Sequence, residues 1–138
     1  MATAKTTKIT RAATRHGLEH YCRDLSSWPR SWMGLEKDLL PGDQLVALFR
    51  PFLEHLAMSN LSPKTIQKHV DNMWVLGGEL ITELNYTPSL RKASVEKVLA
   101  DTIKDGGPIL HHGDSEEQQR SFESTCRKLW RFLNQSQG

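Results

Sequence analysis

The segment whose residue types fit a chemical task is Leu61–His69, which reads Leu-Ser-Pro-Lys-Thr-Ile-Gln-Lys-His. Ser62 can cap the first backbone N–H groups of a helix, and Pro63 suits the first helical position because its missing N–H costs nothing there. Lys64 and Lys68 are four residues apart, so both side chains leave the same helix face. Free N–H groups, a hydroxyl and two lysines at a helix N-terminus favour a phosphate. The segment therefore predicts an anion-binding helix start.

A second basic pattern lies near the end of the chain. Arg120, Arg127 and Arg131 stand at i, i+7 and i+11, with Lys128 beside them, so a helix would place the three arginines on one face. Arginine favours bidentate contacts to phosphate or guanine. A stripe of this kind is also typical of a solvated helix surface, and composition leaves both interpretations open.

The charge balance makes the position of the basic residues more informative than their number. The chain of 138 residues has a net charge of only +2. Residues 1–31 hold six Lys or Arg against two Asp or Glu, whereas the rest of the chain holds twelve against fourteen. A nucleic-acid partner is therefore predicted only if the basic side chains gather on one surface.

Other chemistries have weaker support. His111 and His112, with Asp114 and Glu116, could suggest a metal, but adjacent loop histidines point apart and the spacing fixes no third ligand, so no metal is predicted. The sequence shows no Ser/His/Asp or Cys/His arrangement and no glycine-rich phosphate loop. We therefore expect no cofactor, no small-molecule substrate and no catalysis. His69 is open to two interpretations, packing at the core boundary or contact with a phosphate.

Length and composition predict one soluble domain. Residues 1–14 are polar and basic without the apolar centre of a secretory signal, so we expect a flexible basic arm, with a mitochondrial-type targeting role as the alternative. Residues 15–138 are expected to form a single helical domain. Cys22 and Cys126 lack a pairing motif, which predicts free thiols in a reducing cytoplasm. No apolar run is long enough to span a bilayer.

The hydrophobic spacing predicts an all-α fold without strands. Apolar residues recur at helical intervals in five segments, of which the fourth can divide into two pieces: 15–25, 43–59, 62–84, 88–105 and 115–134. The segment 34–40 is expected to form a short helical turn before Pro41-Gly42. Ser115 and Gln118 form the pattern of a capping box at the start of the last helix.

Three local features refine this prediction. Trp28-Pro29-Arg30-Ser31-Trp32 is expected to interrupt the first helix and fold back as a lid on the core, with an exposed aromatic binding site as the sharper alternative. Pro51 should kink the second helix. Gly77-Gly78 weakens the third helix by about 1 kcal/mol per glycine relative to alanine, which indicates a close crossing or a bend, while Trp74 is assigned to its buried face.

One part of the chain resembles the N-terminal core-binding domain of tyrosine recombinases and phage integrases. It consists of Phe52–Leu56, a short link, Leu61–Ile66, and then Met73 and Leu76. Cys126–Leu133, where a basic and aromatic pattern ends in Phe-Leu, is similar to the last helix of that domain. The resemblance covers about residues 45–134. It implies a SAM-like orthogonal bundle of four to five helices.

The resemblance also implies a DNA clamp that contacts duplex phosphates and the major groove. By position, the implied contacts lie on two helices: Ser62, Lys64, Thr65 and Lys68 on one, and Arg127, Lys128 and Arg131 on the other. His69 beside the first set and Arg120 in the arginine stripe complete the predicted DNA-binding residues. His69 departs from the family, which often has tyrosine there. The family's catalytic domain has no counterpart before Gly138, so strand exchange by this chain alone is not expected.

Two functions follow as hypotheses. The first is a non-catalytic domain that binds double-stranded DNA. The second is a helical protein-interaction module, a regulator or assembly subunit, that kept the fold without the DNA face. This second function would use a homo-oligomer or protein partner, through Trp28, Trp32 or another apolar patch. An unrelated enzyme is the third possibility, and no residue pattern supports it.

Overall fold

The computed structural model describes residues 17–110 and 115–135. In these ranges it contains α-helices and short 3-10 helices and no strand, so the all-α prediction is confirmed. The elements in chain order are α2 (Leu18–Tyr21), η1 (Leu25–Ser27), α3 (Trp28–Trp32), η2 (Glu36–Asp38), α4 (Leu39–Ala57), α5 (Pro63–Tyr86), η3 (Pro88–Lys92), α6 (Val95–Ile103) and α7 (Glu116–Gln135). The arm predicted for residues 1–14 and the residues His111, His112 and Asp114 lie outside the described ranges.

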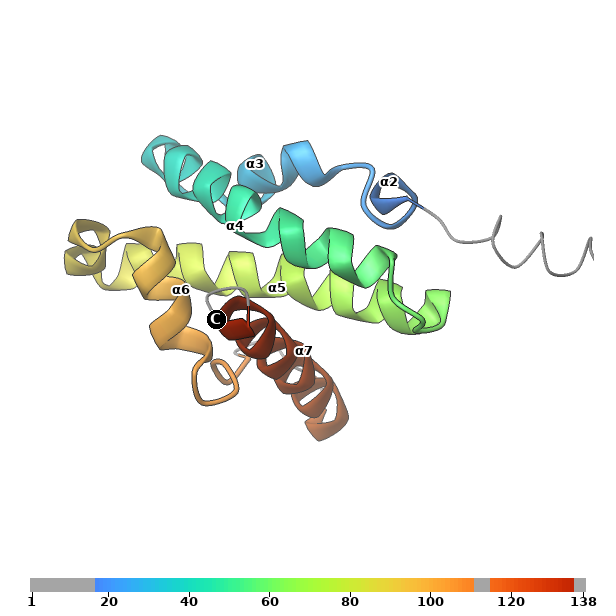
Figure 1. Cartoon of the computed structure of the whole chain (residues 1–138). Coiled ribbons are helices and arrows are strands. Elements are labelled where there is room, and N and C mark those ends of the chain that lie inside the picture. The colour runs from blue at the N-terminus through green and yellow to red at the C-terminus, as the bar shows by residue number, and fades with distance from the viewer. Residues whose placement is uncertain (1–16, 111–114, 136–138) are drawn as a thin grey trace, which may run out of the picture.

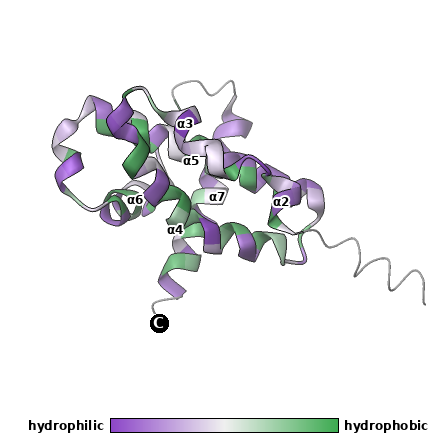
Figure 2. Cartoon of the chain, turned by 90° about the horizontal axis from the view of Figure 1, so that it is seen from above, coloured by the Kyte–Doolittle hydropathy of each residue, from purple (hydrophilic) through white to green (hydrophobic). Residues whose placement is uncertain are grey.

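Helix α5 is the centre of the fold. It runs between α3 and α4 on one side and α6 and α7 on the other (Figure 1), and it contacts all of them. Hydrophobic and hydrophilic residues alternate along the same helices (Figure 2), as expected for amphipathic helices around one core. No helix of the described ranges is both long and apolar enough to cross a membrane.

The start of α5 is the best-predicted boundary in the chain. Pro63 is its first residue, and the Ser62 hydroxyl accepts a hydrogen bond from the Thr65 backbone N–H at 3.2 Å. Similar serine caps start two later helices, with Ser94 accepting from the Lys97 N–H and Ser115 accepting from the Gln118 N–H. The predicted division of 88–105 is also confirmed, because η3 and α6 are separate elements.

Helix α4 begins earlier than the sequence predicts. Pro41-Gly42 does not end an element but lies in the first turn of α4, which starts at Leu39. Proline is tolerated there because the N–H groups of the first turn have no helical partner. Gly42 faces Pro29 of α3, and an added Cβ would lie only 2.9 Å from the Pro29 Cβ. Pro51 lies inside the continuous helix, and the kink expected there stays a prediction.

The tryptophan-proline segment is helical, contrary to prediction. It forms α3, with Pro29 in the first turn, where proline is compatible with a helix. The expected lid on the core is confirmed, since Trp28 and Trp32 are only 3% and 8% exposed. The alternative of an exposed aromatic site at these two residues is wrong. Trp32 packs edge-to-face against Phe49, and its indole N–H donates to the Trp74 carbonyl at 2.9 Å.

Trp74 itself was assigned to the wrong face. Its side chain is 42% exposed, and the indole N–H donates to the Ser31 hydroxyl at 2.9 Å. Helical spacing alone could not predict whether Trp74 is buried, because neighbours cover α5 on several sides. Which residues they cover depends on how those neighbours pack. The hydrogen bond between Trp74 and Ser31 thus links α3 to the exposed edge of α5.

A buried carboxylate fixes the link between α3 and α4. Asp38 is 0% exposed and accepts hydrogen bonds from the backbone N–H groups of Gly34 and Leu35, from Asn85 and from Arg91, the last at 2.6 Å. Burial alone would raise the pKa of Asp38, but these hydrogen bonds outweigh it and hold the pKa below its usual range. The carboxylate thereby ties η2 to the end of α5 and to η3.

The reason for a glycine at Gly77 differs from the helix crossing or bend predicted for Gly77-Gly78, because its close neighbour is the indole of Trp32. A Cβ added to Gly77 would overlap the six-membered ring of Trp32. At Gly78 the nearest Trp32 atom would lie 3.5 Å away, which is an ordinary contact. Both glycines sit in helical backbone, so their difference is steric.

This difference predicts opposite effects for two adjacent substitutions. Gly78→Ala should raise the free energy of unfolding by up to about 1 kcal/mol, because alanine is the better helix former. Gly77→Ala gains the same propensity but displaces Trp32, so it should lower the free energy of unfolding by about 1–3 kcal/mol. Urea denaturation followed by tryptophan fluorescence measures both. Equal effects of the two substitutions would contradict the packing described.

Candidate nucleic-acid interface

The crossing of α5 and α7 is held by polar side chains. His69 Nδ1 and Thr125 Oγ1 are hydrogen-bonded at 2.6 Å, and both residues are buried. The Asn72 amide nitrogen donates to Thr125 Oγ1 and to the carbonyl and hydroxyl oxygens of Ser121. Because hydrogen bonds have directional geometry, this network fixes how the two helices lie against each other. It also fixes the relative positions of the basic side chains that both helices carry.

His69 lies inside the crossing instead of on the surface, with only 2% of the residue exposed. Of its two predicted roles, burial favours packing over contact with a phosphate, and the position is deeper than the expected core boundary. Burial, with smaller effects from Lys68 and Lys128, lowers the pKa of His69 from its ordinary 6.5 to about 4. The imidazole is thus neutral at neutral pH. No local pattern could predict this contact, because the partner Thr125 lies 56 residues away in the chain.

The lowered pKa of His69 predicts a specific acid sensitivity. The unfolded chain takes up a proton at this histidine below about pH 6.5, whereas the folded protein does so only near pH 4. The free energy of unfolding should therefore fall by up to about 3 kcal/mol as the pH drops through this window. In His69→Gln this part of the pH dependence should be missing, as measured by urea denaturation at pH 7, 5.5 and 4.5.

The matched control is His55→Gln, which makes the same substitution at an exposed histidine. Its ring packs at a tilt against Phe132 and it takes no part in the buried His69–Thr125 hydrogen bond, so His55→Gln should keep the wild-type pH dependence. A His69→Gln protein whose stability falls with pH as steeply as that of the wild type would show that His69 does not carry the effect.

Both helices of this crossing carry basic side chains. Lys68 of α5 and Lys128 of α7 are near enough to His69 for their charges to contribute to its lowered pKa. Lys64 and Arg131 are exposed on the same two helices. Within the described ranges none of these four forms an ion pair, whereas Arg120 and Arg127 lie 3.8 Å from Glu116 and Glu123 respectively.

Two hollows border the crossing. The first, of about 650 Å³, is lined by Lys68 and Arg120 together with polar side chains and the acids Asp71 and Glu117. The second, of about 230 Å³, lies beside the turn between α4 and α5 and is lined by Lys128 and Arg131, among others. The basic side chains of α7 thus reach the turn that precedes the capped start of α5.

The start of α5 offers less to an anion than its sequence suggests. The Ser62 hydroxyl is occupied, since it accepts from the Thr65 N–H and donates to the Thr65 hydroxyl at 2.9 Å. The Ile66 N–H bonds to the Ser62 carbonyl, and Pro63 has none. Of the first-turn donors in the described structure, only the Lys64 N–H is left for a ligand. Lys64 and Lys68 are therefore the stronger features here.

Arg127 does not join the basic residues of the crossing. It lies on the α6 side of α7, where its guanidinium packs against Gly106, and it shares a hollow with Lys104 and Trp130. Arg131 lines hollows on both sides of α7. The predicted single surface is thus divided, because a helix that packs against neighbours on two sides presents its charged stripe to two different grooves.

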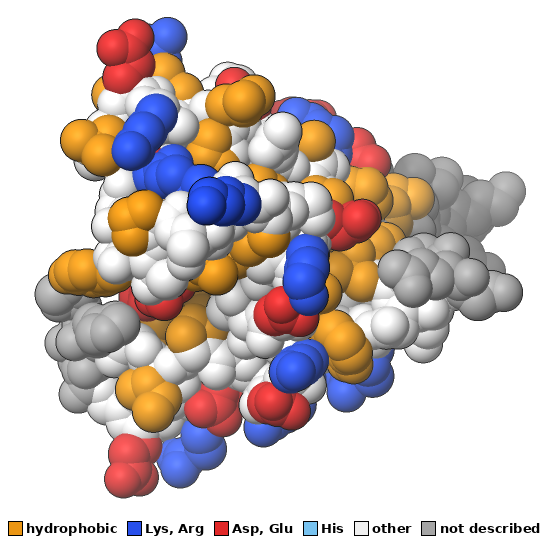
Figure 3. Space-filling view, turned by 90° about the vertical axis from the view of Figure 1, so that its left-hand side faces the viewer, with side chains coloured by type: hydrophobic (Ala, Val, Ile, Leu, Met, Phe, Trp, Pro, Cys, Tyr) orange, Lys and Arg blue, Asp and Glu red, His pale blue; other side chains and the backbone are white. Residues whose placement is uncertain are grey.

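The face toward α6 and η3 has a mixed charge. Figure 3 shows Lys and Arg side chains lying among Asp and Glu side chains there, with hydrophobic side chains exposed between them. A surface of this kind creates no strong field of one sign.

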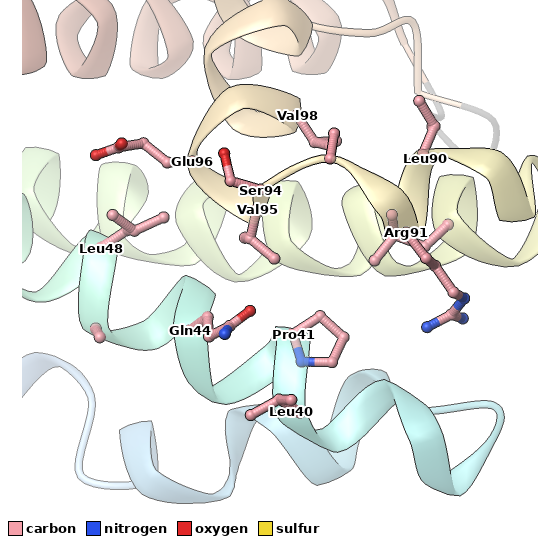
Figure 4. Close-up of a pocket in the computed structure, with 13 residues that line it drawn as sticks. Leu40, Pro41, Gln44, Leu48, Leu90, Arg91, Ser94, Val95, Glu96 and Val98 are labelled. Atoms are coloured by element: carbon pink, nitrogen blue, oxygen red, sulfur yellow. The ribbon is translucent and has the colours of Figure 1, made fainter.

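An apolar groove of about 640 Å³ separates α4 from η3 and α6. In Figure 4, Val95 points from α6 toward α4, where Pro41 and Gln44 lie opposite. Leu40 is 67% exposed at the rim. The guanidinium of Arg91 points away from the groove and is bound to Asp38. Sequence periodicity could not reveal this groove, because it arises where two helices meet.

The described residues contain no group of three or more His, Cys, Asp or Glu placed to bind a metal ion. Cys22 and Cys126 are free thiols, as predicted, and both are buried. Burial is the main cause that raises their pKa values, to about 11 and about 12. Both are therefore protonated and unreactive at neutral pH.

Comparison of the chain with protein-family models, with curated proteins and with solved structures gives no match. The class that the structure itself defines is an all-α domain centred on one long helix. Both helices of its α5–α7 crossing carry basic side chains.

Proposed function

We propose that this protein binds double-stranded DNA through the N-terminal half of α5 and the exposed side of α7. The observation that carries the proposal is the set of four basic residues around the crossing without an ion pair in the described ranges: Lys64, Lys68, Lys128 and Arg131. The resemblance to the core-binding domain of tyrosine recombinases, with its SAM-like bundle, supports the same function. The domain would act as a binding element and not as an enzyme.

The binding is expected to be mainly electrostatic. Each lysine or arginine that neutralises a phosphate releases condensed counterions, which makes the affinity depend steeply on salt. The buried network of His69, Asn72 and Thr125 keeps the two helices in a fixed relation, so the basic side chains need little rearrangement on binding. Thr65 and Ser62 position the backbone at the start of α5, and Arg120 extends the surface once it leaves Glu116.

The test is the salt dependence of duplex binding, measured by fluorescence anisotropy between about 50 and 200 mM salt. Lys64→Ala/Lys68→Ala should weaken binding and reduce the slope of log affinity against log salt by about two, one for each lost phosphate contact. Lys128→Ala/Arg131→Ala should act in the same way. Because these side chains make no ion pair in the described structure, thermal unfolding should be almost unchanged.

The matched control is Lys37→Ala/Lys92→Ala. These exposed lysines lie on η2 and η3, beside the other end of α5, and should leave the slope unchanged. Failure of the wild type to bind any duplex at low salt would refute the proposal, as would equal losses in the control and in the crossing variants.

The apolar groove between α4 and α6 favours a second candidate function, a protein-interaction module. Its partner would be a protein that inserts an apolar helix between Leu40 and Val95. The entrance is apolar and Leu40 is largely exposed, which suits such an insertion. A wild type that binds no duplex yet forms a stable complex or oligomer in size-exclusion chromatography would support this second function in place of the first.

A further inference from the structure

A separate basic and aromatic hollow lies between the end of α6 and the outer side of α7. It has a volume of about 320 Å³, which is within the range of small-ligand sites, and the indole of Trp130 forms part of its wall. Trp130 is half-buried and packs at the edge of the core. The duplex-binding surface does not use this indole, and core packing does not fully cover it.

Three basic side chains stand around this indole. Lys104, at the end of α6, and Arg131 form no ion pair in the described ranges, and Arg127 has only a long contact of 3.8 Å with Glu123. Asp105 is the single acid that lines the hollow. The local balance therefore favours an anionic ligand.

The backbone after α6 shapes the hollow. Gly106 has φ +101°, a conformation that side chains rarely adopt, and the guanidinium of Arg127 lies against it, 3.2 Å from where a Cβ would stand. The next residue, Gly107, also has a positive φ and packs against Cys126. The chain thus turns tightly against α7 and brings Lys104 to the same hollow as Trp130.

We infer that this hollow binds an unpaired nucleotide of single-stranded nucleic acid. The base would stack on Trp130, and Lys104 and Arg127 would contact the flanking phosphates. Aromatic rings combined with basic side chains are the usual means of binding single strands, because every base has a stacking face. A base inside a duplex cannot reach such a wall, so the ligand differs from the one proposed for the crossing. The inference does not rest on duplex binding.

The test uses a fluorescein-labelled oligothymidylate and the full chain at low salt, with anisotropy as the readout. Trp130→Leu removes the stacking face and should weaken binding about 5- to 150-fold, as expected for one stacked base. Lys104→Gln should weaken binding by a smaller factor and reduce its salt dependence. Lys104 is exposed, so this variant keeps the test valid even if Trp130→Leu fails to fold.

Two matched controls accompany these variants. Trp74→Leu removes the exposed indole of α5, and Lys92→Gln removes an exposed lysine of η3. Neither residue lines the hollow, so both variants should bind the oligothymidylate like the wild type. Wild-type protein that does not bind it, or equal losses in the controls, would overturn the inference.

The two sites can be told apart by exchanging the ligands. Lys64→Ala/Lys68→Ala should weaken duplex binding and keep oligothymidylate binding, while Lys104→Gln should do the reverse. Loss of both ligands in both variants would mean one shared non-specific surface and would overturn the proposal of a separate single-strand site.

Discussion

The fold depends on a single constraint, which is that α5 must bury side chains toward several neighbours at once. Its 24 residues contact α2, α3, α4, α6 and α7, so its sequence has to satisfy several packing surfaces along one rod. Gly77 is the clearest result of this constraint, because only a residue without a Cβ allows the Trp32 ring to lie against the helix backbone. The loss of helix propensity at that position is offset by the burial of an indole.

Hydrophobic burial brings the helices together, and buried polar contacts then fix their relative orientation. Asp38 holds η2, η3 and the end of α5 in one arrangement, and the His69–Thr125 pair does the same for α5 and α7. Hydrophobic packing is not directional, whereas a buried hydrogen bond must find its partner in one geometry. The proposed DNA surface depends on the second of these contacts, since it fixes α5, which carries Lys68, against α7, which carries Lys128.

The distribution of ion pairs separates two uses of basic residues on α7. Arg120 and Arg127 lie near glutamates one turn away on the same helix, as is common on a solvated face. Lys128 and Arg131 form no such pair in the described structure and stand near the start of α5 or the hollow of Trp130. Basic residues held without acidic partners at a fixed crossing are suited to an external anion, and this is the physical basis of the proposed duplex-binding surface.

The sequence by itself determined the local elements, because these follow from short-range chemistry. Local signals were sufficient to predict α5 and α7, the two longest helices described, and the all-α class. These signals are the cap at Ser62, the proline at Pro63 and the apolar spacing of both helices. The same local rules failed at Pro41-Gly42 and at Trp28–Trp32. In both places the proline lies in the first turn of a helix instead of ending one. Local composition could not distinguish these two roles of proline.

Only the tertiary structure decided which side chains meet. It moved His69 from a possible phosphate contact to the interior, left Trp74 exposed and separated Arg127 from Lys64 and Lys68. Each of these outcomes depends on a neighbour distant in sequence, Thr125 for His69 and Ser31 for Trp74, so no helical period could predict it. The start of α5 remains a predicted part of the binding surface. The Ser62 hydroxyl is used to cap the helix, so Lys64 and Lys68 are the groups expected to contact a partner.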